Sequence, residues 1–152
     1  MNARSLLIAT FAFATTLVIG SSHSSPAQIL PTTKPAEHVK IIQGPNVESA
    51  VPNMAILRWT SSNPGGPDEH YAVAHYGTDP GHLSETAKSH IRLNRNHPDT
   101  VFRVRLIGLK PQTTYYYWVT SMGADGINDP AKSDINQFTT PPPGKVIKPD
   151  TK

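Results

Sequence analysis

The sequence predicts an all-β domain, a two-sheet sandwich of about seven strands, and three observations support this prediction. No segment repeats apolar residues at helical spacing. Short β-rich stretches instead alternate with turns made of Gly, Pro, Asn and Asp. The third observation is the stretch 109–120, whose second half, 114–120, is β-branched or aromatic at every position. We therefore expect one folded domain with a core of its own.

The residues before this strand form a corner. Gly108 and Pro111 bracket Leu109, and the next residues lead into a strand that begins at Tyr115. The spacing Leu-x-Pro-x-Thr-x-Tyr resembles the tyrosine corner of fibronectin type III and related immunoglobulin-like sandwiches. The resemblance implies that the Tyr115 hydroxyl bonds back to upstream backbone and fixes the connection between two strands.

The predicted strands are short and are separated by loops. Gly44-Pro45 ends the first strand, residues 90–100 are mostly loop, and residues 123–130 form a long loop before the last strand. Ile135 and Phe138 are out of phase by one residue, which indicates a β-bulge near Asn136. The predicted strands are 39–43, 54–60, 71–76, 83–88, 101–106, 115–120 and 133–139.

Alternation along each strand assigns its side chains to an inner or an outer face. In segment 71–76 the phase is ambiguous, and the fibronectin pattern places Ala72 inside and Val73 outside. Along the strand that begins at Tyr115, Thr120 is expected to face outward. The expected inward set is Val39, Ile41, Ala55, Leu57, Trp59, Ala74, Tyr76, Phe102, Val104, Leu106, Leu109, Tyr115, Tyr117, Val119 and Phe138.

The first 27 residues have the order of a secretory signal peptide. Arg4 precedes the uncharged apolar run 6–20, and cleavage fits after Ser24 or after Ala27. The alternative is a membrane anchor, although this run is shorter than the roughly 20 apolar residues of a spanning helix. The signal peptide predicts a secreted or periplasmic protein with no membrane span after cleavage, and the absence of cysteine is more usual for a periplasmic protein.

Composition divides the chain into four regions. Residues around the domain are rich in proline and poor in apolar periodicity, which is typical of disorder. The regions are the signal peptide 1–27, a disordered lead-in 28–38, the folded domain 39–140 and a Pro-rich disordered tail 141–152.

Three stretches together resemble the N-terminal, fibronectin-like domain of purple acid phosphatases and related secreted metallophosphoesterases. They are 55–60 (AILRWT), 76–83 (YGTDPGHL) and 108–117 (GLKPQTTYYY). In that family the next domain carries the chemistry, with two metal ions held by aspartates, histidines, an asparagine and a tyrosine. None of its motifs occurs here, and only nine residues follow Pro143. We therefore expect the catalytic domain to be missing.

Composition and motifs give no support for catalysis, metal binding or nucleic-acid binding. The chain has no cysteine, and its seven histidines form no HxH or HxxxH pair with acidic support. No Gly-x-Ser-x-Gly elbow is present, and residues 125–129 lack the spacing of a calcium loop. A formal net charge of +3 is too small for a nucleic-acid footprint. We expect no catalytic residue, no metal and no cofactor.

An aromatic strip is the first candidate binding surface. Tyr71, His75, Tyr116 and Trp118 should share the outer face of one sheet. Exposed aromatic side chains on a sandwich could stack on sugar rings or dock a partner domain. The alternative is that a neighbouring edge strand or a flanking tail covers them.

An arginine cluster is the second candidate. Arg58, Arg103 and Arg105 should lie together on the outer face of the other sheet, because their two strands pair there. Such a patch could take an anionic glycan or a phosphate. The alternative is a solvated face that discourages edge-to-edge aggregation.

Two functions remain open. The first is an exported, non-catalytic fibronectin type III module that contacts an unknown protein or glycan. The second is a stand-alone domain that is accessory to a separately encoded metallophosphoesterase. No residues support a stand-alone enzyme, and we expect a monomer that binds no nucleic acid.

Overall fold

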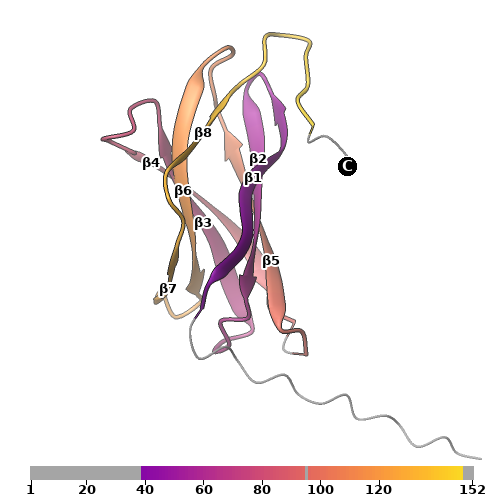
Figure 1. Ribbon diagram of the computed structural model, residues 1–152, viewed down its shortest axis with the longest axis vertical. Coiled ribbons are helices and arrows are strands. Elements are labelled where there is room, and N and C mark those ends of the chain that lie inside the picture. The colour runs from indigo at the N-terminus through magenta and orange to yellow at the C-terminus, as the bar shows by residue number, and fades with distance from the viewer. Residues whose placement is uncertain (1–38, 95, 149–152) are drawn as a thin grey trace, which may run out of the picture.

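The computed structural model describes residues 39–94 and 96–148 as two antiparallel β-sheets packed face to face (Figure 1). The smaller sheet has the order β1-β2-β5, formed by β1 (Ile41–Val51), β2 (Met54–Ser62) and β5 (Asp99–Ile107). The larger sheet has the order β4-β3-β6, with β7 and β8 on the far side of β6. Its strands are β4 (Glu85–Arg92), β3 (Glu69–Gly77), β6 (Thr114–Gly123), β7 (Asn128–Lys132) and β8 (Asn136–Thr139).

This architecture confirms the predicted all-β sandwich of two sheets. The predicted signal peptide and lead-in lie outside the described residues. Within the described part of the chain, no helix is long and apolar enough to span a membrane.

Strict alternation builds the core between the sheets. Ala55, Leu57 and Trp59 of β2 are buried against the other sheet, and β5 contributes Phe102 from the paired position. The rings of Trp59 and Phe102 stack with centroids 5.4 Å apart. Such a pair stabilises the core beyond what the burial of the two rings contributes. The predicted inward residues are buried, except that Val39, Ile41 and Phe138 are half-buried.

The tyrosine corner before β6 is confirmed. The backbone N–H of Lys110 donates to the Tyr115 hydroxyl oxygen over 2.9 Å. Thr140, just after β8, closes the same corner, because its hydroxyl donates to the Lys110 carbonyl oxygen over 2.6 Å and accepts from the Thr113 N–H over 3.0 Å. Gly108 turns the chain here with a φ of 73°. Hydrogen bonds thus hold the start of β6 both to the corner and to the residue that follows β8.

The first strand does not end at Gly44-Pro45, as the sequence predicted. Gly44 has a φ of 81°, and the pairing with β2 shifts register on either side of the turn. Pairing then resumes at Asn46, opposite Arg58, and continues to Val51. Because β1 lies at a sheet edge, proline's missing N–H is tolerated at this irregularity.

Two other boundaries differ from the prediction. β4 continues to Arg92, because His90 and Ile91 pair with β3. The predicted last strand is divided into β7 and β8, which both pair with β6 and are separated by residues 133–135. The irregularity predicted near Asn136 is therefore a full interruption of the strand just before it, and Ile135 is exposed there.

The segment after β8 crosses from the larger sheet to the smaller one. Ile147 and Ala50 exchange two backbone hydrogen bonds of 2.8 Å each. Figure 1 shows this yellow segment passing over the top of the sandwich and down beside β1 and β2. Residues 141–148 therefore differ from the disordered tail that the sequence predicted, because backbone pairing with Ala50 holds them.

Replacement of Tyr115 by Phe tests the corner. We expect Tyr115→Phe to lower the free energy of unfolding by about 1–2 kcal/mol, because the Lys110 N–H loses its acceptor in a partly buried site. Denaturant unfolding followed by fluorescence measures the change. Tyr116→Phe is the matched control, since Tyr116 lies on the outer face of the same strand. Equal stability of the two variants would contradict the assignment of the corner.

Candidate binding face

The outward side chains of the larger sheet lie in rows across its strands. One row places His75 of β3 between Thr86 of β4 and Trp118 of β6. The next row runs through Lys88, Val73, Thr120 and Lys132. We call this surface the aromatic face, and it comprises Tyr71, His75, Lys88, Tyr116, Trp118 and Lys132.

Two neighbouring side chains fix the orientation of the Trp118 ring on the aromatic face. The His75 ring stacks on it with centroids 4.1 Å apart and planes 17° apart. The Lys132 ammonium lies 4.2 Å from the centroid of the same ring, which is cation–π geometry. Because His75 is on β3 and Lys132 is on β7, they approach from opposite sides of β6. Both faces of the indole are therefore covered, and its edge is what the half-buried ring presents to solvent.

The surroundings of His75 favour the neutral form of its imidazole. Burial lowers the pKa of its imidazole, and the charges of Lys132 and Lys88 lower this pKa further. Its Nδ1 atom lies 3.1 Å from the Thr86 hydroxyl oxygen, a contact that fixes the ring plane. The Thr86 contact and the stack on Trp118 thus hold the imidazole in one orientation.

The structure brings two of the four predicted aromatic residues into contact and places the other two further along the same face. Tyr71 packs edge-on against His90 at a centroid distance of 5.6 Å. Tyr116 lies one row beyond Trp118, opposite Gly77 and beside β8. The predicted residues therefore share one face, but the row of Val73 and Thr120 separates Tyr71 from His75 and Trp118.

Val73 and Thr120 lie on the outer face, as predicted, but they are not exposed to solvent there. They are only 3% and 5% exposed although both lie on the outer face. They pair with each other at the centre of the sheet and are flanked in register by Lys88 and Lys132. Long neighbouring side chains cover these two short ones. The sequence did not identify the two lysines as part of the face.

The predicted anion patch on the smaller sheet is partly neutralised. Arg58 and Arg103 are paired across β2 and β5, and Arg105 lies on the same face. Glu48 of β1 accepts hydrogen bonds from the Arg103 guanidinium at 2.8–3.0 Å and lies 3.8 Å from Arg58. The Arg103 hydrogen bonds hold the pKa of the Glu48 carboxyl below its usual range. This partner was missed because the first strand was expected to end before Glu48.

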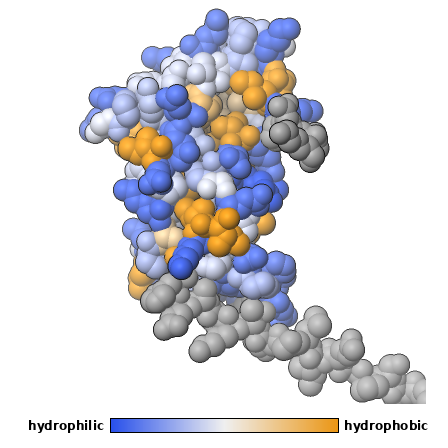
Figure 2. Space-filling view, viewed as in Figure 1, coloured by the Kyte–Doolittle hydropathy of each residue, from blue (hydrophilic) through white to orange (hydrophobic). Residues whose placement is uncertain are grey.

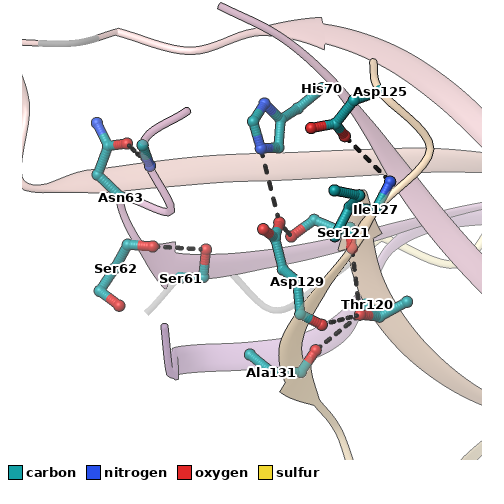
Figure 3. A network of polar contacts seen from close by, with 11 residues as sticks. Ser61, Ser62, Asn63, His70, Thr120, Ser121, Asp125, Ile127, Asp129 and Ala131 are labelled. Carbon is teal, nitrogen blue, oxygen red and sulfur yellow. Dashed lines mark hydrogen bonds and ion pairs between the residues drawn. The ribbon is translucent and has the colours of Figure 1, made fainter. Parts of the chain in front are cut away.

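A polar cluster occupies one end of the core (Figure 3). His70 is 2% exposed, and its Nε2 atom lies 3.8 Å from the Asp129 carboxylate. The Ser121 hydroxyl donates to the same carboxylate rather than to the histidine. A hydrolytic triad needs the serine on the histidine, so this trio does not have catalytic geometry. Among the residues that the structure describes, no group of three or more His, Cys, Asp or Glu side chains could hold a metal ion.

Comparison with known proteins assigns the family. Residues 45–140 match the family described as "Purple acid Phosphatase, N-terminal domain". The chain belongs to this family. The match confirms the resemblance to the purple acid phosphatase N-terminal domain that three short stretches of the sequence indicated. Only this non-catalytic domain is detected, and a search of curated protein sequences finds no match.

Solved structures similar to this purple acid phosphatase N-terminal domain are distant in sequence. The sensor domain of the anti-sigma factor RsgI4 of Pseudobacteroides cellulosolvens is 19% identical, with a TM-score of 0.43 over 71% of this chain and 92% of that chain. The fibronectin type III domain of human fibronectin type III domain containing protein 3 is 15% identical, with a TM-score of 0.43 over 79% and 96%. The FN5 domain of Drosophila Lar is 18% identical, with a TM-score of 0.36 over 66% and 98%.

Replacement of Glu48 by Gln tests the ion pair on the smaller sheet. The depressed pKa means that Glu48 stabilises the fold above its unfolded-state pKa and that this stabilisation is lost as the pH falls through the folded-state pKa. We expect Glu48→Gln to lower the free energy of unfolding by up to about 1 kcal/mol at pH 7, because the pair is solvent-exposed. Urea unfolding at pH 7 and at acid pH measures the difference between the two proteins.

The same difference should disappear at a pH where the wild-type carboxyl is protonated. Glu85→Gln is the control, since Glu85 is an exposed acid on β4. A stability difference for Glu48→Gln that is independent of pH would contradict the charge-based origin.

Proposed function

We propose that this purple acid phosphatase N-terminal domain is an exported, non-catalytic module that holds a protein partner on its aromatic face. The leader-like sequence of the first 27 residues supports export. The family match to a non-catalytic domain supports a role in binding rather than in chemistry. The aromatic face then supplies the surface on which a partner can be held.

The covered indole of Trp118 is the observation that favours a protein over a glycan. Sugar-binding platforms offer the open face of an aromatic ring, whereas both faces of Trp118 are occupied by His75 and Lys132. The ring presents an edge, which is suited to insertion between side chains of a partner. Since its neighbours already fix its orientation, little side-chain entropy remains to be lost on binding. Trp and Tyr are also the residues most enriched at energetically important interface positions.

A second candidate partner follows from the family. The chain matches the domain that accompanies purple acid phosphatases, so a separately encoded metallophosphoesterase is a specific candidate for the protein held on the aromatic face. In that case the domain acts as an accessory, and the partner supplies all metal ligands.

Replacement of Trp118 by Ala tests the proposed function. The naturally processed chain, immobilised, should capture its partner from the extracellular fraction of its own organism. Trp118→Ala should weaken capture by about tenfold or more, since a central aromatic residue contributes about 2 kcal/mol at such interfaces. Quantitative mass spectrometry of the captured proteins measures the change, and circular dichroism verifies that the variant is folded.

Ile107→Ala is the matched control. Ile107 is 68% exposed but lies on β5 of the smaller sheet, so its loss should leave capture unchanged. Undiminished capture by Trp118→Ala would exclude the aromatic face as the interface. Retention of the wild-type chain on a glycan array, with no protein captured, would exclude a protein partner.

A further inference from the structure

Two lysines flank the centre of the aromatic face. Lys88 of β4 and Lys132 of β7 lie at the two ends of one row, with Val73 and Thr120 between them. Three strand spacings separate the ends of this row, which places the two backbone positions about 14–15 Å apart. Both side chains are exposed at their outer ends, while the residues between them are buried. The row therefore carries a positive charge at each of its two ends, on either side of the strand that bears Trp118.

This charge has no counterpart on the face. Within residues 39–94 and 96–148, no carboxylate forms an ion pair with Lys88 or Lys132. Among the paired outward positions of the larger sheet, Glu69 is the one acid, and it lies 3.4 Å from His90 at one end. On the smaller sheet, by contrast, Glu48 contacts Arg103 and Arg58 and offsets part of the charge of the arginine cluster. The two lysines of the aromatic face are thus cations that no carboxylate of that face offsets.

His75 lies close enough to Lys88 and Lys132 to be affected by the charge of each. The groups that face it are Thr86 and Lys88 from β4, Trp118 from β6 and Lys132 from β7. Both lysines disfavour a proton on its ring. The positive potential therefore extends over the centre of the face and is not confined to its two edges.

We propose that the aromatic face recognises an acidic protein segment, whose carboxylates form ion pairs with Lys88 and Lys132 on either side of Trp118. This inference rests on the proposed function and specifies the chemistry of the partner. The charge complementarity argues for an acidic partner, and the covered indole argues for a protein. A carboxylate placed beside His75 would also raise the pKa of its imidazole, so binding should strengthen as the pH falls toward the range in which His75 titrates.

Poly-L-glutamate is the probe for this inference. Binding of the naturally processed chain is followed by NMR at the side-chain resonances of His75 and Trp118. We expect a saturable shift of both resonances and an upward shift of the His75 pKa in the bound state. Lys88→Gln/Lys132→Gln should weaken binding by about three- to tenfold, as expected for two exposed ion pairs.

Lys110→Gln/Lys145→Gln is the charge-matched control. Both lysines are exposed, and neither lies on a strand of the larger sheet, so this variant loses the same net charge elsewhere on the molecule. It should bind poly-L-glutamate within about twofold of the wild type, a difference well below one ion pair at the upper end of the measured range. Equal weakening by the two double variants would overturn the inference, because the attraction would then be nonspecific.

Two further outcomes separate this inference from the proposed function. If Trp118→Ala loses the captured partner while Lys88→Gln/Lys132→Gln retains it fully, the aromatic face is the interface and its acidic specificity is wrong. If polygalacturonate gives the lysine-dependent shifts and poly-L-glutamate does not, the face takes a carboxylated polysaccharide, and the inference of a protein segment is overturned.

Discussion

The pairing of β3 with β6 is the interaction on which both faces of the larger sheet depend. Its register sets Ala74 opposite Val119 on the core side and His75 opposite Trp118 on the outer side. A slip of one residue would exchange these faces, because side chains alternate along a strand. The corner at Tyr115 fixes where β6 begins, and Thr140 ties the same point to the end of β8. Core packing and the composition of the aromatic face therefore follow from one register.

The outer side of this sheet is packed rather than merely solvated. Val73 and Thr120 are buried there, under side chains that also carry the charge and the aromatic rings of the face. The Thr120 hydroxyl donates to the Ala131 carbonyl oxygen over 2.7 Å, which fastens β7 beside β6. This contact supports the position from which Lys132 reaches Trp118.

On the side shown in Figure 2, apolar residues form small, separate patches among hydrophilic ones, so recognition by a broad apolar surface is not favoured on that side.

Local patterns predicted the parts of the fold that alternation controls. The inward phase of β2 and β5 and the corner at Tyr115 were correct, because each is determined by neighbours in the sequence. Pairing between distant segments was not predictable in the same way. The continuation of β1 past Gly44, which brings Glu48 to the arginines, depends on β2. The sequence also placed His75 and Trp118 on one face, but it omitted Lys132, which fell between two predicted segments.

Site-specific photo-crosslinking tests most directly whether the outer face of the larger sheet holds the partner. A photoreactive phenylalanine derivative would replace Gln137, an exposed residue on β8 beside Tyr116. In a second chain it would replace Ile107 on the opposite side of the sandwich. After irradiation in the native extracellular fraction, we expect a protein adduct from position 137 and none from position 107. An adduct from position 107 alone would contradict the assignment and transfer the interface to the smaller sheet.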